Sequence, residues 1–223
     1  DSKGEWRTPF NPRSSTHRND DYCEGTAWQW TWFVPHDVDG LVELMGGRDA
    51  FIGKLDSLFV ADSSLEGESV SVDISGLIGQ YAHGNEPSHH IAHLYNYVGQ
   101  PYKTQALVDS VLHTLYFNNP DGLSGNEDCG QMSAWYILNA MGFYQVCPGK
   151  PVYSIGRPLF NEATVHLKDG KSFKVIAHNN SRDNKYVRSI VLNGNKLETP
   201  FFTHQDIVDG GTLELTMGSE PLK

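Results

Sequence analysis

The spacing of apolar residues changes near residue 150, and this change constrains the fold more than any other feature. Before it, apolar side chains recur every three or four residues, which is the spacing of one helix face. After it, apolar and polar residues alternate as in strands. Pro148, Gly149 and Pro151 mark the junction. The sequence therefore predicts a mainly α protein with a small β region: helices in residues 1–148, then an antiparallel β domain in residues 149–223.

The helical part is expected to hold several amphipathic helices, because its apolar stripes are separated by glycine stops and a proline start. These stripes run through residues 41–45, 51–59, 87–98, 108–115 and 132–141. The segment 27–34 (AWQWTWFV) is apolar on nearly all sides. If this segment is helical, it is predicted to lie inside the helical assembly.

The β part contains four expected strands and two turn signals. The turn pairs are Asp169-Gly170 and Asn193-Gly194, both typical of tight hairpins. The expected strands are Ala163–Leu167, Ser172–Ala177, Val187–Leu192 and Thr212–Thr216. Hairpin turns between neighbouring strands predict an antiparallel sheet.

Composition excludes several classes of protein. The 223 residues are 39% hydrophobic and 20% charged, so the chain has material for a folded core. The formal charge of −10 argues against a nucleic acid partner, since phosphate binding depends on Lys and Arg. No stretch is long enough to span a bilayer, and the N-terminus does not resemble a signal peptide. The three cysteines have no metal-ligand spacing and allow at most one disulfide: Cys23, Cys129 and Cys147.

The aromatic content points to a possible ligand class. Ten Tyr, ten Phe and five Trp accompany ten His and 22 Gly. Flat aromatic faces with nearby carboxylates and amides suit a carbohydrate site, and the same residues suit an ordinary packed core. Three polar, glycine-bearing segments at predicted helix ends are the places where a site is expected: residues 22–30, 81–90 and 125–135.

Glu24 is the candidate general acid. It precedes a tryptophan-rich segment, and apolar surroundings favour the protonated carboxyl that an acid needs. The alternative is that Glu24 caps the helix start. Trp28 in the same segment is either a core residue or a platform for a sugar ring.

Asn85 and Glu86 are the candidate metal ligands, because amide and carboxylate oxygens on a turn suit a hard cation such as Ca²⁺. A zinc site on the nearby histidines is the weaker alternative. His89 and His93 are one helical turn apart but lack the glutamate of a zinc-protease motif.

Asp128 is the candidate general base. A carboxylate at a helix N-terminus is kept ionised by the helix dipole, although an Asp at this place is also an ordinary cap. Glu24 and Asp128 together form a pair of carboxylates in different surroundings, as glycoside hydrolysis requires.

Four ordered segments resemble one family, the calcium-dependent exo-acting α-mannosidases of glycoside hydrolase family 92. They are YCEGTAWQWTWFVPHD (22–37), GNEPSHHIAHLYNYVGQPYKTQ (84–105), GLSGNEDCGQMSAWYILNAMGFYQV (122–146) and IGRPLF (155–160). The resemblance extends over essentially the whole chain. It implies hydrolysis of terminal α-linked mannose with inversion, assisted by a Ca²⁺ ion that binds the sugar hydroxyls.

The resemblance also implies roles for individual residues. Glu24 would be the general acid and Asp128 the general base, with Asn126 or Glu127 assisting; the family often has an acidic residue at the position of Asn126, so this division of roles stays open. Asn85 and Glu86 would serve the calcium site. Sugar contacts are expected from His83, His89, Trp28 and Glu127. An inverting pair predicts carboxyl groups roughly 6.5–9.5 Å apart.

Members of this family are several-fold longer, with an N-terminal β-sandwich and an (α/α)₆ barrel. The chain would then supply the later barrel helices and the closing β region, and its partners would be a mannose-containing glycan and the missing N-terminal domain. Incomplete helical packing would expose apolar faces, through which a homodimer is expected to form. The family implies a periplasmic or secreted enzyme of N-glycan degradation.

Three alternatives remain open at this stage. The chain could be a carbohydrate-binding or structural module without turnover, a helical-toroid glycosidase that acts on glucose-type sugars, or a zinc hydrolase. Dependence on calcium and release of mannose would distinguish them.

Overall fold

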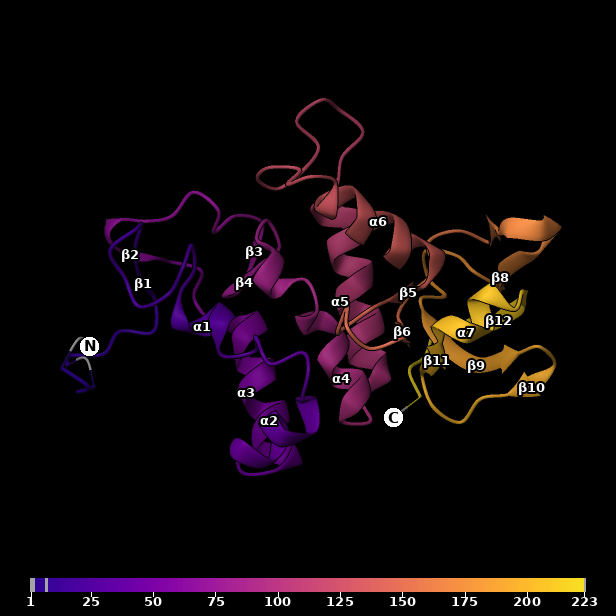
Figure 1. Ribbon diagram of the computed structural model, residues 1–223, viewed down its shortest axis with the longest axis horizontal. Helices are drawn as coiled ribbons and strands as arrows, with labels where there is room; N and C mark the ends of the chain where they lie inside the picture. The colour runs from indigo at the N-terminus through magenta and orange to yellow at the C-terminus, as the bar shows by residue number, and fades with distance from the viewer. Residues whose placement is uncertain (1–2, 7, 223) are drawn as a thin grey trace.

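A computed structural model describes residues 3–6 and 8–222 of the chain. Helices α1, α2 and α3 lie at one end of the molecule and the larger sheet with α7 lies at the other, with α4, α5 and α6 between them (Figure 1). The helices are α1 Ala27–Trp30, α2 Val38–Leu44, α3 Arg48–Val60, α4 Leu94–Tyr97, α5 Pro101–Thr114, α6 Gln131–Met141 and α7 His204–Val208. Three 3₁₀ turns cover Glu86–Ser88, Ile91–His93 and Lys168–Gly170.

Four of the predicted helical stripes are confirmed as α2, α3, α5 and α6. Pro101 begins α5, where its missing N–H costs nothing. Gly142 ends α6 at φ 105°, a conformation that glycine adopts without a steric penalty. The apolar faces of these helices form one core around Trp32, Phe51, Leu55 and Trp135.

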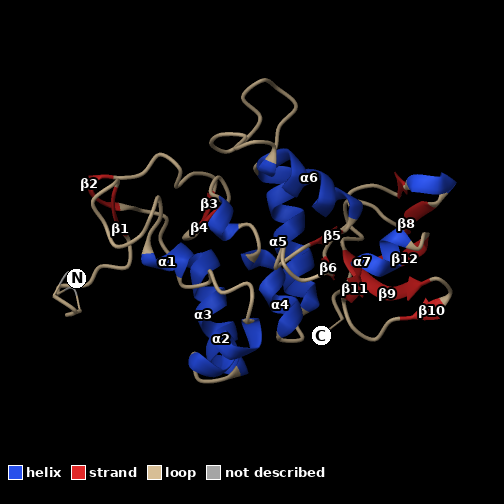
Figure 2. Ribbon diagram, viewed as in Figure 1, coloured by secondary structure: helices blue, strands red, loops and turns tan. Residues whose placement is uncertain are grey.

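The part of the chain expected to be helical, residues 1–148, is not made of helices alone. This part also contains β1 Ser14–Thr16, β2 Glu66–Ser69, β3 Leu77–Ile78 and β4 Tyr81–Ala82 (Figure 2). Strand β1 pairs parallel to β2, and β3 pairs antiparallel to β4. The described helices do not by themselves form a ring of helix pairs.

The helix expected over residues 87–98 is divided into two 3₁₀ turns and the single turn of α4. Buried histidines in this segment bond to main-chain carbonyls elsewhere: His89 to His83 and His90 to Trp32. These tertiary bonds fix the ring positions and override the local helical period. The segment 27–34 is likewise helical only over α1, although Trp32 is fully buried as predicted.

The β part contains two sheets. The strands are β5 Phe143–Tyr144, β6 Val152–Ile155, β7 Glu162–His166, β8 Ser172–His178, β9 Tyr186–Leu192, β10 Asn195–Lys196, β11 Phe201–Thr203 and β12 Gly211–Gly218. The larger sheet has the order β10-β9-β12-β8-β7, and the smaller has the order β11-β6-β5. All four predicted strands are present as β7, β8, β9 and β12.

The prediction of a wholly antiparallel β domain is wrong, because β12 runs parallel to β8. The chain reaches β12 through β11 and α7, a crossover long enough to bring it back in the same direction. Strand β12 therefore lies between β8 and β9, with Leu213 and Leu215 buried in the second core.

The smaller sheet crosses the predicted boundary at residues 148 and 149. Phe143 of β5 pairs with Ile155 of β6, so strands from both sides share hydrogen bonds. In the segment after β6, the Nε atom of Arg157 lies 3.1 Å from the Oδ1 atom of Asp109 in α5, and both side chains are buried. The helical and β parts are thus joined by a sheet and by an ion pair. No helix among the described residues is long and apolar enough to cross a membrane.

Candidate active site

The three polar segments expected to form a site lie together in the structure. The side-chain amide of Asn85 donates a hydrogen bond of 2.5 Å to the main-chain carbonyl of Glu24. The carboxyl groups of Glu86 and Asp128 adjoin closely enough to interact directly. The indole N–H of Trp135 donates to the carbonyl of His89 at 2.9 Å. The start of α1, the turn after β4 and the loop before α6 therefore share one region.

Thr26, rather than Glu24, caps α1. The Thr26 hydroxyl accepts from the Trp28 N–H at 3.2 Å, and the side chain of Gln29 accepts from the Thr26 N–H at 2.6 Å. This reciprocal arrangement satisfies the free amides at the helix start. Glu24 lies two residues earlier, exposed, with a left-handed φ of 50°. The capping alternative for Glu24 is therefore wrong.

The N-cap residue of α6 is Gly130, and the carboxylate that bonds the first turn of this helix belongs to Glu127 rather than to Asp128. The Glu127 carboxylate accepts hydrogen bonds from the N–H of Ser133 at 3.0 Å and from the Ser133 hydroxyl at 2.9 Å. Asp128 is exposed with φ 49°, and the next residue, Cys129, has φ 56°. The carboxylate of Asp128 is thereby left for interactions outside the helix.

Both candidate catalytic carboxylates thus stand on a left-handed backbone. For residues with a Cβ this conformation costs about 1–2 kcal/mol, and it persists only where surrounding structure enforces it. Such strained residues cluster at functional sites. The same conformation occurs at Arg18, Cys129, Asp169, Asn179 and Asn193, so at Glu24 and Asp128 it describes the loops and does not by itself mark a site.

Negative charge accumulates around Glu86. Burial is the main cause that raises the pKa of the Glu86 carboxyl. A hydrogen bond at the Glu86 main chain lowers this pKa by less than burial raises it, and the neighbouring carboxylates of Asp128 and Asp73 also raise it. A divalent cation would relieve this repulsion, and oxygen ligands of this kind suit Ca²⁺. Within the described residues, no three His, Cys, Asp or Glu side chains are arranged to hold a metal ion. Further ligands would have to be amide, main-chain, water or substrate oxygens.

His83 lies beneath the site with no exposed surface. Its ring nitrogens meet the hydroxyls of Tyr81 at 2.8 Å and Tyr116 at 2.7 Å, and its ring packs edge-on against Trp135 at 4.3 Å. Burial lowers its pKa well below the usual value, so the ring is neutral at pH 7. His83 therefore packs among Tyr81, Tyr116 and Trp135 in the core under the candidate site, and its buried ring has no surface that a sugar could contact.

His89 is joined to the loop before α6 by a residue that the sequence did not single out. The side-chain amide of Gln131 donates to His89 Nδ1 at 3.1 Å and also lies 3.1 Å from the Tyr144 hydroxyl. The opposite ring nitrogen of His89 donates to the His83 carbonyl. Burial lowers the pKa of His89 to about 4, so this ring is also neutral at pH 7.

The other two histidines do not converge with His89 on a common point. His90 bonds to the Trp32 carbonyl at 2.7 Å, and His93 bonds to Asn139 at 2.8 Å and Ser154 at 3.0 Å. Each ring is buried and already has its own protein partners. This arrangement gives the zinc alternative no support.

Comparison with known proteins identifies the family. Residues 1–219 match the glycosyl hydrolase family 92 catalytic domain. The chain belongs to glycosyl hydrolase family 92. Among solved structures, it is 42% identical to a family 92 α-mannosidase of Bacteroides thetaiotaomicron in complex with mannoimidazole, with a TM-score of 0.91 over 100% of this chain and 30% of that one. It is 44% identical to an inverting family 92 mannosidase of the same bacterium, with a TM-score of 0.83 over 99% of this chain and 30% of the other.

A more distant relative is a secreted glycosidase of Arthroderma benhamiae, described as uncharacterized. It is 30% identical over 210 residues, which are 93% of this chain and 25% of the relative. The chain thus spans about a quarter to a third of the length of these family 92 relatives.

Trp28 and Asn126, two further residues that the sequence predicted for the site, lie in the same polar segments as Glu24 and Asp128. Trp28 is half-buried, and the Lys54 ammonium of α3 sits 4.1 Å from the centre of its ring. Asn126 is exposed in the loop before α6, beside Glu127. The sugar contacts expected from Trp28 and Glu127, and the assistance expected from Asn126, stay predictions.

Glycines allow the loops of the candidate site to approach one another. A Cβ on Gly84 would lie 1.9 Å from the Ser75 hydroxyl and 2.8 Å from the Ser124 carbonyl, and one on Gly125 would lie 2.9 Å from the same hydroxyl. These glycines directly precede the segments that carry Glu86 and Asp128. Their close packing sets how near the two carboxylates come.

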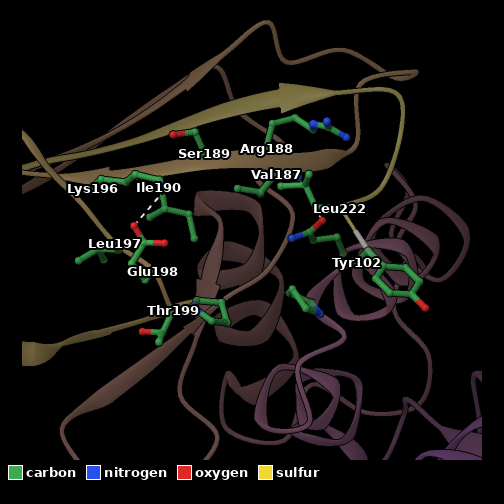
Figure 3. A pocket seen from close by; sticks show the side chains of 13 residues that line it. Tyr102, Val187, Arg188, Ser189, Ile190, Lys196, Leu197, Glu198, Thr199 and Leu222 are labelled. Carbon is green, nitrogen blue, oxygen red and sulfur yellow. Dashed lines mark hydrogen bonds and ion pairs between the residues drawn. The ribbon is translucent and has the colours of Figure 1, made fainter.

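One cavity of the described structure includes a residue of the candidate site. Glu24 lines an open hollow of about 320 Å³, together with His17, Arg18 and residues 20–23. Figure 3 shows another cavity, of about 200 Å³, lined by residues of α5, β9, β10 and the segment after β10; they include Tyr102, Val187 and Leu197. This second cavity contains none of the predicted site residues.

Proposed function

We propose that this chain carries the acid–base centre of an exo-acting α-mannosidase that releases terminal α-linked mannose with inversion. The observation that carries the proposal is that the carboxylates of Glu24 and Asp128 are not the groups that bond the amides at the starts of α1 and α6. Other residues cap both helices, and the two carboxylates are exposed in one region with Asn85 and Glu86. The two Bacteroides relatives named as mannosidases support the choice of sugar.

Glu24 would act as the general acid and Asp128 as the general base. The acid protonates the glycosidic oxygen as the bond to the leaving group breaks, and the base removes a proton from water attacking the opposite face of the sugar. The exposed position of Asp128 gives water access to its carboxylate. Glu127, held by Ser133, fixes the loop on which Asp128 stands.

Asn85 and Glu86 would supply protein ligands to a calcium ion. The accumulation of negative charge at Glu86 is the observation that makes these residues fit a divalent cation. When bound, calcium would hold sugar hydroxyls and favour a distorted ring. The Asn85 amide keeps this turn against the Glu24 loop whether or not the cation is present.

The remainder of the enzyme would complete the site. We infer that the helices form the later part of an (α/α)₆ barrel, closed by segments outside this chain, and that the enzyme is secreted or periplasmic and acts on N-glycans. The secreted relative from Arthroderma benhamiae supports the location. Exposed apolar side chains on α2, α3 and α6 (Leu44, Val60 and Ile137) would pack against the missing segments, or between two copies.

The test is release of mannose from an aryl α-mannoside and from α-linked mannobiose, with calcium and with chelator. Glu24→Gln and Asp128→Asn should each reduce turnover of mannobiose at least about 100-fold. Glu43→Gln, an exposed change on α2, is the matched control and should have no effect. Binding of mannobiose without release of mannose by a folded chain would favour a carbohydrate-binding module instead.

A further inference from the structure

The cavity of about 200 Å³ between the start of α5 and strand β9 is separate from the candidate active site (Figure 3). Pro101 and Tyr102, the first residues of α5, line it. At the other end of α5, Tyr116 follows the last helical residue, Thr114, and bonds to His83 under the candidate active site at 2.7 Å. The 14 residues of α5 measure about 21 Å along the helix axis. The cavity and the candidate active site therefore lie at opposite ends of this helix.

Several polar groups that line this cavity bond to no other residue in the part of the chain that the structure describes. Gln105 is 4% exposed, and its side-chain oxygen accepts from the Val187 N–H at 3.1 Å. This bond fixes the side chain and leaves its two amide N–H donors for a ligand in the cavity. The hydroxyls of Tyr102, Ser189 and Thr199 likewise have no hydrogen bond within the described residues. The cavity thus offers donors and acceptors that the fold itself does not use.

Apolar surfaces stand beside these polar groups. The ring of Tyr102 and the side chain of Leu222 lie at one side of the cavity, and Leu197 lies at the other (Figure 3). Tyr102 is half-buried and Leu222 is 48% exposed, so both can be reached from solvent. A sugar ring has C–H groups on its faces and hydroxyls around its edge. An aromatic face with hydroxyl and amide groups nearby matches both kinds of surface.

The charged groups around the cavity already have partners. The Lys196 ammonium lies 3.0 Å from the Glu198 carboxylate, and Nη1 of Arg188 donates to the Glu220 carbonyl at 2.6 Å. A phosphate or carboxylate ligand would need cations that are not already bonded within the protein. The charges therefore favour a neutral ligand.

We propose that this cavity is a second, non-catalytic binding site whose ligand is one neutral hexose ring of a glycan. Ligand pockets usually measure about 300–1,000 Å³, so a cavity of about 200 Å³ suits a single ring rather than a longer chain. The site uses neither Glu24 nor Asp128 and requires no metal ion. It goes beyond the proposed function, because it holds a sugar at the far end of α5 without hydrolysing it.

The test is titration of the unmodified chain with mannose, glucose and galactose, each followed by NMR in calcium and in chelator. At least one hexose should shift the backbone amide resonances of residues 102–106, 187–190 and 196–199, with a Kd of about 1–10 mM. Chelator should leave these shifts unchanged. If no hexose shifts these resonances, or if shifts occur only in residues 84–89 and 126–131, the second site is wrong. Tighter binding of mannose 6-phosphate than of mannose would overturn the neutral ligand.

Two variants separate contact with the sugar from damage to the fold. Tyr102→Ala removes the aromatic face and should weaken hexose binding at the cavity at least about fivefold, whereas Tyr102→Phe keeps the ring and should bind within about twofold of the unmodified chain. Gln105→Glu keeps an oxygen to accept from the Val187 N–H but removes the amide donors, and should also weaken binding about fivefold. Unchanged resonances away from the cavity show that each variant is folded. Equal affinities of folded Tyr102→Ala and Tyr102→Phe would overturn the site as described.

Discussion

The side chain of Asn85 holds the main chain of Glu24 through a 2.5 Å hydrogen bond between residues 61 positions apart. The donor is an amide at the turn proposed to bind calcium, and the acceptor is the carbonyl of the proposed general acid. The bond thus joins the two chemical parts of the site through the backbone. Because Glu24 has a left-handed φ, its conformation depends on contacts of this kind.

Asn85→Asp separates metal binding from positioning. The variant keeps an oxygen ligand for calcium but loses the N–H donor and places a carboxylate beside the Glu24 carbonyl. We expect calcium to bind at least as tightly, while kcat falls about tenfold because the acid is misplaced. Calcium titration by calorimetry, combined with mannobiose kinetics at saturating calcium, measures both quantities. A loss of activity that additional calcium restores would contradict the positioning role.

Substitutions at Glu127 and Asp128 should have different effects, on the stability of the fold and on turnover respectively. Glu127→Ala removes the acceptor for two Ser133 hydrogen bonds and should lower the free energy of unfolding by about 1 kcal/mol. Asp128→Asn should leave the unfolding free energy within about 0.5 kcal/mol and abolish turnover. Urea denaturation measures the stability of both variants, and mannose release measures their turnover. If the two substitutions lower the free energy of unfolding equally, the assignment of different roles to Glu127 and Asp128 is wrong.

The elements that the sequence predicted correctly are those that can be recognised from residues close together in the chain. Helices α3 and α6 and strands β8 and β9 each present a regular apolar face, and their residue ranges follow from that period. The three segments of the site were also found from the sequence, because polar residues and glycines at helix ends are a local pattern.

What the sequence did not predict depends on contacts between distant residues. The parallel pairing of β12 with β8 requires knowing where α7 returns the chain. The bonding of the first turns of α1 and α6 by Thr26 and Glu127 depends on side-chain reach, since an adjacent carboxylate is available in each segment. Gln131 gave no signal of its own, because its role appears only when His89 and Tyr144 are brought beside it.

Gly84 lies too close to Ser75 and Ser124 to accept a methyl side chain. A Cβ there would lie 2.8 Å from the Ser124 carbonyl, a main-chain atom that cannot turn aside. Gly84→Ala should lower the free energy of unfolding by about 2 kcal/mol or more and reduce activity by moving Glu86 away from Asp128. Gly149→Ala, with no atom within 4 Å of the new Cβ, is the matched control. Equal stability of the two variants would show that the junction can relax.

The strain in the loop before α6 can be measured at Cys129, which is exposed and has φ 56°. Cys129→Gly removes the Cβ that makes this conformation unfavourable and should raise the free energy of unfolding by about 1 kcal/mol. Cys129→Ala removes the thiol but keeps the Cβ, so it should show no such gain. If both variants have the same stability, the left-handed backbone at this position stores no strain.

Buried histidines should make the protein sensitive to mild acid. Burial lowers the pKa values of His90 and His93 to about 4, against 6.5 for an ordinary histidine. Between these values the unfolded chain binds protons that the folded chain cannot, so stability is full above pH 6.5 and is lost as the pH falls toward 4. The loss should reach about 3 kcal/mol for each ring.

His93→Gln tests this linkage because glutamine keeps a polar side chain between Asn139 and Ser154 but does not titrate. The variant is expected to be less stable at every pH, so the informative quantity is the slope. Urea unfolding at pH 7.5, 6.0 and 5.0 should show a decline with falling pH that is shallower than in the unmodified chain, by about 1 kcal/mol per pH unit between pH 6.0 and 5.0 and by about half of that between pH 7.5 and 6.0. His166→Gln, at an exposed position on β7, is the matched control. An unchanged slope in His93→Gln would mean that protonation of His93 does not contribute to the loss of stability in acid.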